Sequence, residues 1–294
     1  MPDDFDFQRT ISDEAARVAH YRPMVESYYE QVTDTYRENW GESFHFAVFH
    51  GQETLAEAMT ALERSLADES GLKPGMRALD VGCGIGGPAT TVAERSGAHV
   101  TGLNLSQKQI GLATARAAQL GLADRVRFDL GDAMRMAYPD ASFDVVYLFE
   151  SGCHMPDKAR FFKECARVLK PGGVFLGYDW LAKDGLTDAE HAEYIEPICK
   201  YHSVPHLGTV ATYRQNLVAA GLSVEECVDV AERGNITRNW EILDEKAITT
   251  INALPPGAIP PTLGMMIKGG VALKVAAARG YFVIGHWRAR KQAG

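Results

Sequence analysis

The feature that most constrains this chain is an apolar segment that leads into a glycine-rich turn, residues 78–87 (Ala-Leu-Asp-Val-Gly-Cys-Gly-Ile-Gly-Gly). Gly82, Gly84 and Gly86 remove side chains at alternate positions, which lets the backbone approach a bound ligand closely. Gly82, Gly84 and Gly87 also satisfy the G-x-G-x-x-G dinucleotide pattern. The turn by itself therefore does not decide which ligand is bound.

After a turn at residues 71–75, strand patterns alternate regularly with helical patterns. Ser106 and Asp157 each stand where a helix N-cap is expected. The pattern predicts strands at 76–81, 99–105, 126–130, 143–149 and 174–180, and helices at 88–97, 106–120 and 157–169. Alternation of this kind predicts an α/β fold, a Rossmann-like doubly wound sheet with helices on both faces.

The regions on either side of this alternation have a different pattern. Residues 1–70 predict an N-terminal segment of helices rich in aromatic side chains, and residues 71–294 predict the main α/β domain. Two stretches, at about 181–206 and 254–280, are predicted to be insertions that form a helical cap over the ligand edge of the sheet. The C-terminal third otherwise predicts helices at 209–220 and 236–253 and strands at 223–230 and 281–287.

Composition excludes several classes of function. The formal net charge of -8 argues against nucleic acid as a partner, because phosphate binding needs a basic surface. No apolar run approaches the length of a membrane span, so stable membrane insertion is not expected. The first residues, Met1-Pro-Asp-Asp-Phe, lack the pattern of a signal peptide. The five cysteines form no C-x-x-C pair, which favours a reduced, cytoplasmic protein with no structural zinc or other metal site.

Further motifs distinguish between two cofactors. A nicotinamide-binding protein usually has an acidic residue at the end of its second strand, whereas this chain has Asn104, which can still bond a ribose hydroxyl. Asp80 stands two residues before the first glycine, and Gly-Asp-Ala follows the third strand at 131–133. With Phe-Asp-Val-Val at 143–146 and Arg-Val-Leu-Lys-Pro-Gly-Gly at 167–173, these segments resemble the motif series of S-adenosylmethionine-dependent methyltransferases.

This resemblance covers roughly residues 70–180 and implies a class I methyltransferase fold with S-adenosyl-L-methionine as cofactor. It assigns the turn glycines to the amino acid end of the cofactor and polar residues after the next two strands to ribose and adenine. Two alternatives stay open. Asp132 could serve only to form a turn, and Gln109 could be a solvated helix residue. The cofactor-binding residues implied are Asp80, Gly82, Gly84, Gly86, Asn104, Leu105, Gln109, Asp132, Ala133 and Glu150.

Segments outside the cofactor motifs resemble a narrower family. The aromatic stretches 28–36 and 40–46, with Glu-Ser-Gly-Cys-His at 150–154 and Tyr-Asp-Trp at 178–180, resemble the sterol C-24 methyltransferases. The resemblance fades through the C-terminal third. It implies methylation of an alkene carbon in an isoprenoid, and related enzymes also methylate prenyl diphosphates and the prenyl chains of terpenoid natural products.

The chemistry gives an independent reason for the aromatic residues. An alkene is a weak nucleophile, so the protein must hold it in line with the methyl group in a dry pocket. Methyl transfer leaves a carbocation, which aromatic faces stabilise by roughly 0.5 to 2 kcal/mol each. Phe46 is a further candidate wall, and packing of these aromatic residues in the core stays open as the alternative. The predicted substrate-binding residues are Tyr21, Tyr28, Tyr36, Trp40, Phe44 and His45.

A base must then remove a proton from the cation, directly or after the cation has rearranged. If the methylated cation rearranges, the enzyme would also act as a terpene cyclase, and the sequence leaves this open. Glu150 and His154 are the predicted catalytic residues, because both follow the fourth strand at its carboxyl edge. A buried Glu150 would have a raised pKa, and binding of the cofactor ammonium or capping of a helix stays open as its alternative role. His154 has a suitable ordinary pKa near 6.5, but a structural histidine stays open as the alternative. His45 is a third candidate.

Three other functions stay open at this point. One is a small-molecule O- or N-methyltransferase of secondary metabolism, and another is a protein of this fold that binds or cyclises a ligand without methyl transfer. The third is action on a lipid at a membrane surface, suggested by Met-Met-Ile-Lys at 265–268, although a lid over an apolar pocket is the preferred interpretation of that segment. A homo-oligomer is also left open, since the sequence does not decide the oligomeric state.

Overall fold

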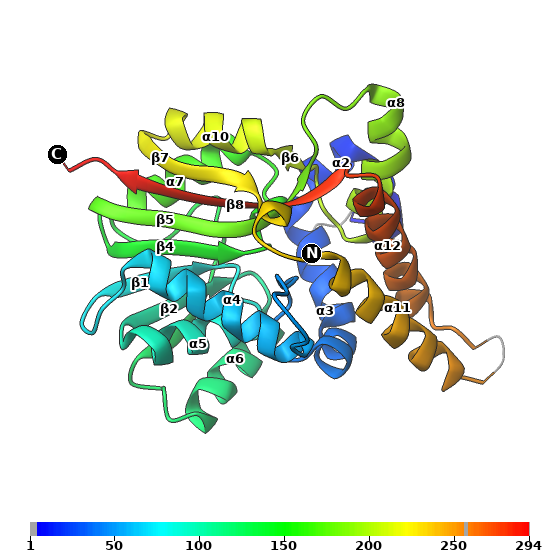
Figure 1. Ribbon diagram of the computed structural model, residues 1–294, viewed down its shortest axis with the longest axis horizontal. Helices are drawn as coiled ribbons and strands as arrows, with labels where there is room; N and C mark the ends of the chain where they lie inside the picture. Colours follow the sequence, from blue (N-terminus) through cyan, green and yellow to red (C-terminus); the bar gives the residue numbers. More distant parts are fainter. Residues whose placement is uncertain (1–4, 256–257, 294) are drawn as a thin grey trace.

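The centre of the structure is one sheet whose strands run in the order β3-β2-β1-β4-β5-β8-β7 (Figure 1). Strands β1 to β5 pair in parallel, and β8 pairs antiparallel with both β5 and β7. A short strand, β6, pairs with the end of β5. The strands are β1 (Arg77–Val81), β2 (His99–Asn104), β3 (Val126–Leu130), β4 (Phe143–Phe149), β5 (Leu169–Ala182), β6 (Gly208–Thr209), β7 (Leu222–Asp229) and β8 (Phe282–Lys291).

This computed structural model describes residues 5–255 and 258–293. Residues 1–4 of the acidic start, and residues 256–257 within the stretch predicted as an insertion at 254–280, lie outside the described residues. The α/β prediction is confirmed, and each strand predicted in the alternating part is present. Strands β5 and β8 are longer than predicted, and residues 174–182 of β5 pair antiparallel with residues 282–290 of β8.

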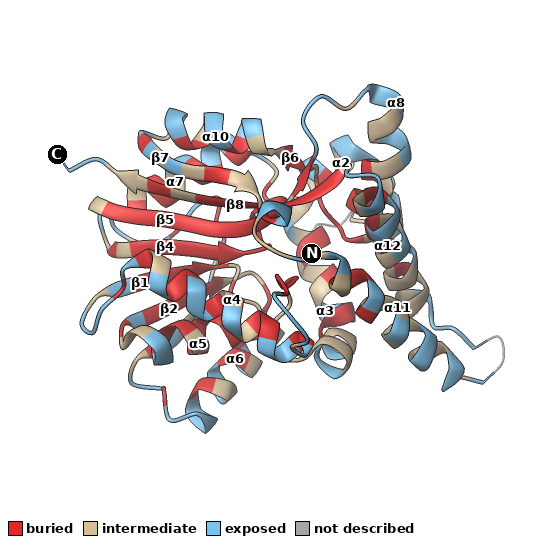
Figure 2. Cartoon of the chain, in the orientation of Figure 1, coloured by how far each residue is buried: buried red, intermediate tan, exposed pale blue. Residues whose placement is uncertain are grey.

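Helices cover both faces of the sheet. In Figure 1, α4, α5 and α6 lie along one side, while α7 and α10 lie at the other. Side chains that are apolar toward the sheet and polar toward solvent give these helices one buried and one exposed face, as Figure 2 shows. Their bounds are α4 (Leu55–Ser70), α5 (Gly87–Ser96), α6 (Gln107–Gln119), α7 (Lys158–Val168) and α10 (Val210–Ala219).

The remaining helices gather beyond the carboxyl ends of the strands. Helix α3 lies between the sheet and the pair α11 and α12 (Figure 1). Helix α12 packs on both α9 and α11. Short 3₁₀ turns, η1 (Gly152–His154) and η3 (Val230–Glu232), follow β4 and β7. The helices are α1 (Phe7–Ile11), α2 (Glu14–Ala19), α3 (Tyr21–Trp40), α8 (Asp188–Glu190), the π-helical turn η2 (His191–Ile195), α9 (Glu196–Tyr201), α11 (Thr237–Asn252) and α12 (Pro261–Ala278).

Two predicted helix caps have the expected geometry. The Ser106 hydroxyl accepts a hydrogen bond from the backbone N–H of Gln109 at 3.2 Å and begins α6. Asp157 accepts from the backbone N–H of Arg160 at 2.9 Å and begins α7. Each side chain satisfies a donor that the first turn of a helix leaves free, so these two boundaries follow from local chemistry.

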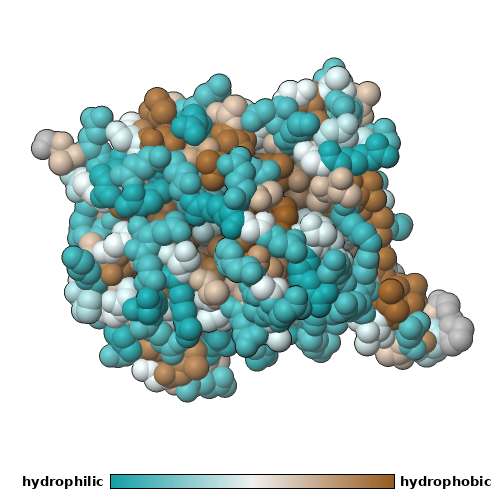
Figure 3. All heavy atoms as spheres, viewed as in Figure 1, coloured by the Kyte–Doolittle hydropathy of each residue, from teal (hydrophilic) through white to brown (hydrophobic). Residues whose placement is uncertain are grey.

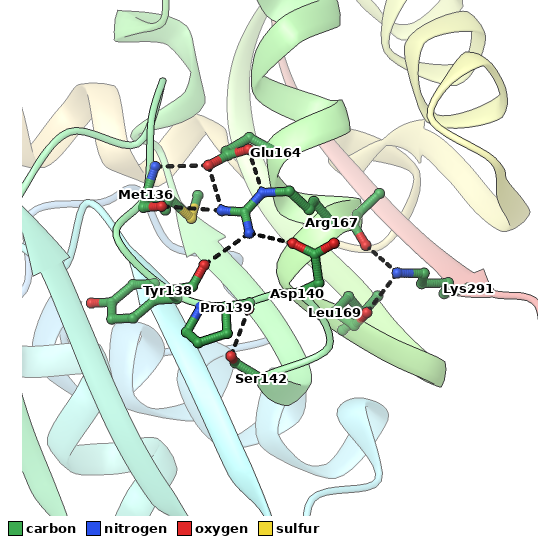
Figure 4. A network of polar contacts seen from close by, with 10 residues as sticks. Met136, Tyr138, Pro139, Asp140, Ser142, Glu164, Arg167, Leu169 and Lys291 are labelled. Atoms are coloured by element: carbon green, nitrogen blue, oxygen red, sulfur yellow. Dashed lines mark hydrogen bonds and ion pairs between the residues drawn. The ribbon is translucent and has the colours of Figure 1, made fainter.

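Arg167, within one of the sequence motifs, organises the loop between β3 and β4 (Figure 4). Its guanidinium binds Glu164 through two hydrogen bonds and donates to the carbonyl oxygens of Met136 and Tyr138 and to Asp140. Glu164 also accepts from the backbone N–H of Met136 at 2.8 Å. The planar fork of arginine suits this set of acceptors, and it fixes the loop that begins at the carboxyl end of β3.

Candidate active site

Two adjoining cavities lie beyond the carboxyl ends of β1 and β4, where ligands bind in open α/β sheets. We call them the inner cavity, which borders the glycine turn, and the outer cavity, which lies among α3, α11 and α12. Of the ten predicted cofactor residues, eight line the inner cavity: Asp80, Gly82, Gly84, Asn104, Leu105, Gln109, Ala133 and Glu150.

The three turn glycines have different roles. All three have positive φ angles, +78° at Gly82, +53° at Gly84 and +85° at Gly86. A Cβ on Gly82 would lie 2.3 Å from the Cβ of Ser151, and one on Gly86 would lie 2.8 Å from the ring of Phe128. A Cβ on Gly84 would meet no atom within 4 Å. Gly84 thus borders open space, whereas Gly86 does not line the cavity and packs against Phe128.

Asp80 lies at the floor of the inner cavity and is only 1% exposed. Burial, together with the nearby charge of Glu63, raises the pKa of Asp80 to about 8. Its Oδ2 atom has no hydrogen-bond partner among the described residues. Leaving a buried acceptor unpaired costs free energy. The Oδ2 atom of Asp80 is therefore suited to accept a hydrogen bond from a ligand or from a bridging water.

Asn104 and Gln109 belong to a chain of hydrogen bonds that reaches α3. The Asn104 amide donates to Gln109 Oε1 at 2.7 Å, and Gln109 donates to the hydroxyl of Thr33 at 3.0 Å. Asn104 Oδ1 accepts from the backbone N–H of Leu105 at 2.8 Å. The solvated alternative for Gln109 is wrong, since its side chain is buried and joins the cofactor loop to the N-terminal helices.

Asp132 and Tyr21 lie apart from the other predicted residues of their two sets. Asp132 does not line the inner cavity, because its carboxylate accepts from the Tyr21 hydroxyl and from the backbone N–H of Met134. Tyr21 in turn borders the inner cavity rather than the outer one, where it was predicted to bind substrate. Asp132 therefore holds α3 over the inner cavity, and Gly131 and Ala133 on either side of it line the wall.

The outer cavity has a largely apolar wall. Five of the six predicted substrate residues line it, namely Tyr28, Tyr36, Trp40, Phe44 and His45. Phe46 and Trp180 add two stacked rings, with centroids 5.6 Å apart. Helices α11 and α12 close the far side with aliphatic side chains such as Leu243, Leu263 and Ile267.

Apolar side chains continue outward from this cavity to the surface. Val271 lines the cavity and is 55% exposed, and Ile248 of α11 is 59% exposed. Figure 3 shows hydrophobic atoms gathered at the edge of the molecule where α12 and the end of α11 lie. The mouth of the cavity is thus itself apolar, which suits a substrate that is poorly soluble in water.

Five residues line both cavities and mark their junction: Tyr29, Phe44, His45, Glu150 and His154. Both predicted catalytic residues are among them. A group transferred from a ligand in the inner cavity to one in the outer cavity must pass between these side chains. The prediction that Glu150 and His154 lie together at the carboxyl edge of β4 agrees with this placement.

Glu150 connects three parts of the site. Its Oε1 accepts from the backbone N–H of Phe46 at 2.9 Å, and its Oε2 accepts from Trp180 Nε1 at 2.6 Å. Burial raises the pKa of Glu150 to about 7. The residue also has a φ of +52°, a backbone conformation that a non-glycine residue seldom adopts. Strain of this kind is held at functional sites by the surrounding structure, here by the two hydrogen bonds.

His154 forms a pair with Tyr29. His154 Nδ1 lies 3.1 Å from the carbonyl oxygen of Ser203, which can only accept, so Nδ1 carries the ring proton. His154 Nε2 is then free to accept from the Tyr29 hydroxyl, 3.0 Å away. Burial lowers the pKa of His154 to about 4, so the ring is neutral at physiological pH. A neutral imidazole that is hydrogen-bonded to a phenol can accept the hydroxyl proton of that phenol.

His45 is not available as a base. Its Nδ1 lies 2.8 Å from the carbonyl oxygen of Phe46, and its Nε2 lies 3.1 Å from Glu63 Oε1. Burial acts to lower the pKa of His45, but the hydrogen bond and charge of Glu63 outweigh it and raise the pKa. Both nitrogens face acceptors, so His45 is a buried cation paired with Glu63 and stacked on Phe149.

The turn that carries His154 is held by a buried lysine. Lys158 Nζ donates to the carbonyl oxygens of Gly152, Cys153 and Met155 at 2.7 to 2.9 Å. Asp179, also fully buried, accepts from the backbone N–H of Cys153 at 3.1 Å. These bonds satisfy the backbone of η1 and fix His154 against β5.

Sequence reasoning missed several residues of the site. Tyr29 and Trp180 stood within segments that carried the family resemblance, so a signal for them was present. His202 lines the outer cavity and follows α9, in a stretch with no recognisable motif. Thr33 lies on α3, and nothing in its spacing indicates that it bonds Gln109.

Comparison with known proteins agrees with this geometry. Residues 79–177 match the family model described as "Methyltransferase domain". The chain carries a methyltransferase domain. It is 46% identical over 175 residues to a sterol 24-C-methyltransferase of Gibberella zeae, which covers 60% of this chain and 46% of that protein. It is 39% identical over 221 residues to cycloartenol-C-24-methyltransferase 1 of Oryza sativa subsp. japonica, covering 74% of this chain and 64% of that protein.

These matches confirm the predicted resemblance to sterol C-24 methyltransferases. The matched segments span less than two thirds of the length of either relative. Among solved structures, the [4+2]-cyclase SpnF superposes with a TM-score of 0.79 at 25% identity, covering 93% of this chain and 97% of that one. Among the described residues, no helix is both long and apolar enough to cross a membrane.

Proposed function

We propose that this protein is an S-adenosylmethionine-dependent C-methyltransferase that methylates an alkene carbon of a neutral, apolar isoprenoid. The observation that carries the proposal is the junction of the two cavities, where Tyr29, Glu150 and His154 border both. The relatives named above are methyltransferases that act on carbon 24 of sterols or of cycloartenol. An isoprenoid substrate also fits the apolar wall of the outer cavity.

The inner cavity has features that fit S-adenosylmethionine. Gly84 has no neighbour where a side chain would stand, so its backbone is open to a ligand. Asp80 presents a buried, unpartnered oxygen that suits an ammonium group or a bridging water. Asn104 carries an amide at the end of β2, where ribose hydroxyls bind in this class of fold. When bound there, the cofactor supplies an electrophilic methyl group on a sulfonium.

The residues of this chain then have distinct tasks. The aromatic wall of Tyr36, Trp40 and Phe44 holds the alkene in a dry pocket and faces the positive charge that forms on carbon. Glu150 supplies a negative charge at the junction and links the loop at Phe46 to β5. Helix α3, in the segment predicted at 1–70, acts as a lid that separates both cavities from water.

The Tyr29–His154 pair takes the proton that the cation must lose. Tyr29 Oη accepts a proton from carbon while its own hydroxyl proton moves to His154 Nε2. The imidazolium that forms keeps its Nδ1–H bond to the carbonyl oxygen of Ser203. The electron pair of the broken C–H bond becomes the new alkene, so the step balances without an outside reagent.

The charges around the outer cavity favour a neutral substrate over a prenyl diphosphate. Two lysines border it, Lys246 and Lys274, and Lys274 forms an ion pair with Asp244. A diphosphate would need several positive charges to offset its own. The polar residues at the far end include Asn39 and Thr250, which are joined by a 3.2 Å hydrogen bond and suit a single hydroxyl group.

The proposal is tested by measuring S-adenosylhomocysteine formation with matched acceptors. A Δ24 sterol and farnesol would be compared with farnesyl diphosphate, and with phenol and amine acceptors of similar size. We expect turnover with a neutral alkene and at least about tenfold less with the diphosphate. Turnover only with the phenol or amine would favour an O- or N-methyltransferase, and conversion of an acceptor without S-adenosylhomocysteine would favour a cyclase.

A further inference from the structure

A second tyrosine–histidine pair lies in the wall of the outer cavity and has no task in the mechanism above. Tyr28 Oη lies 3.3 Å from His202 Nδ1, and Tyr36 Oη lies 3.0 Å from Tyr28 Oη. Tyr28 is adjacent to Tyr29 on α3, and their rings meet edge to face with centroids 5.2 Å apart. The two neighbouring phenols therefore bond to different histidines, His202 and His154.

His202 resembles His154 in its burial, its lowered pKa and its contact with a tyrosine hydroxyl. It is only 5% exposed, and burial lowers its pKa to about 4, so the ring is neutral. Its Nε2 has no hydrogen-bond partner among the described side chains and backbone, and it lies against Gly269 of α12. With the ring proton on Nε2, His202 Nδ1 accepts from Tyr28 as His154 Nε2 accepts from Tyr29.

The two pairs differ in their distance from the methyl donor. Tyr29 and His154 border both cavities, whereas Tyr28, Tyr36 and His202 border the outer cavity alone. Methyl transfer from the inner cavity places the new methyl group at the junction. The positive charge forms on the other alkene carbon, which lies one bond farther into the outer cavity. A cation there can lose a proton on either of its two sides.

We propose that Tyr28 and His202 are a second proton acceptor, and that the two pairs together decide which alkene is released. This inference rests on the proposed C-methyltransferase function. The Tyr29–His154 pair takes a proton from the methyl-bearing carbon, giving a methyl-side product. The Tyr28–His202 pair takes a proton from the carbon beyond the cationic centre, giving a distal product.

The distal step balances in the same way as the first. The C–H bond beyond the cationic centre breaks, and its electron pair forms the new carbon–carbon π bond. The proton goes to Tyr28 Oη while the hydroxyl proton of Tyr28 moves to His202 Nδ1. Tyr36 then donates to or accepts from Tyr28 Oη, which holds the phenol in place.

The test is the ratio of the two alkene products, measured by mass spectrometry and NMR on an acceptor that the unmodified protein methylates. Tyr28→Phe and His202→Asn each remove the second acceptor, and we expect a shift of at least about fivefold toward the methyl-side product. Tyr29→Phe is expected to shift the ratio toward the distal product. Tyr138→Phe is the matched control, since Tyr138 donates its hydroxyl to Asp129 and lines neither cavity, and its ratio should stay within about twofold.

Calorimetric binding of S-adenosylhomocysteine shows that each variant keeps its fold. An unchanged ratio in both Tyr28→Phe and His202→Asn, with methyl transfer still occurring, would overturn the second acceptor alone. Loss of all methyl transfer in these two variants would also overturn it, because the pair would then act before the cation forms. No methylated carbon with the unmodified protein would instead reject the proposed function together with this inference.

Discussion

Glu150 and Trp180 are joined by a 2.6 Å hydrogen bond from the indole Nε1 to the carboxylate, at the junction of the two cavities. This bond connects the end of β4 to the end of β5, and the second oxygen of Glu150 binds the loop at Phe46. The carboxylate is therefore held where positive charge must pass from a sulfonium to a carbon. A fixed dipole or charge that faces a developing charge is usually a large contribution to catalysis.

Replacing this charge should slow methyl transfer. Glu150→Gln keeps the size of the side chain but removes the negative charge, and we expect the turnover rate to fall by about 10²-fold. Binding of S-adenosylhomocysteine, measured by calorimetry, should weaken much less. Glu190→Gln, at an exposed helix cap that lines neither cavity, is the control. Unchanged turnover in Glu150→Gln would remove the carboxylate from the mechanism.

The raised pKa of Glu150 also predicts how stability depends on pH. The unfolded carboxyl ionises near pH 4.5 and the folded one near pH 7, so ionisation costs folding free energy as the pH rises through this window. Glu150→Gln should therefore gain stability relative to the unmodified protein between pH 4.5 and 7, by up to about 3 kcal/mol. Urea unfolding of both proteins at several pH values measures this difference.

The Glu190→Gln control should show the opposite dependence of stability on pH. The backbone N–H of Thr187 and its hydroxyl lower the pKa of Glu190. Glu190→Gln should then lose stability relative to the unmodified protein as the pH rises through the low-pH range. A difference for Glu150→Gln that is flat with pH, or that falls as pH rises, would contradict the buried carboxyl described above.

Two glycines of the turn should respond differently to alanine. Gly82→Ala places a Cβ 2.3 Å from that of Ser151, so we expect a loss of unfolding free energy of about 2 kcal/mol or more. Gly84→Ala meets no neighbour, and the strain of its φ of +53° should cost only about 1 kcal/mol. Gly84→Ala should nevertheless weaken S-adenosylhomocysteine binding. Equal binding by Gly84→Ala and the unmodified protein would place the cofactor elsewhere.

Arg167 is expected to stabilise the loop after β3 more than a surface ion pair would. Arg167→Met removes hydrogen bonds to Glu164, Asp140 and two carbonyl oxygens, and should cost about 1 to 3 kcal/mol of unfolding free energy. Arg95→Met removes an exposed pair with Asp68 and should cost below about 1 kcal/mol. Chemical denaturation compares the two, and similar losses would contradict a special role for Arg167.

Much of this fold was predictable, because its signals are local. Ser106 and Asp157 begin helices through their own side chains, and the strand at 143–149 was predictable because a buried parallel strand is almost continuously apolar. The hydrogen bond between Tyr21 and Asp132 was not predictable, since the two residues are 111 positions apart in the chain. Only the packing of α3 on the sheet brings them together.

In the candidate site, too, some features follow from local sequence signals and others depend on packing. Glu150 and His154 follow a strand, and their place at its carboxyl edge follows from topology. Their hydrogen-bond partners do not follow from topology. Tyr29, the partner of His154, lies on α3, and Trp180, the partner of Glu150, lies near the end of β5. His45 looked like a free histidine beside aromatic residues, and only the contact with Glu63 on α4 reveals that it is a paired cation.

The central claim is that a methyl group passes between Glu150 and His154 onto an alkene carbon. The most direct test is incubation with S-adenosylmethionine carrying a ¹³C-labelled methyl group and a neutral isoprenoid with a trisubstituted alkene, followed by NMR of the product. We predict that the label appears as a methyl group bonded to a former alkene carbon. A label found only on oxygen or nitrogen of the acceptor would contradict this account.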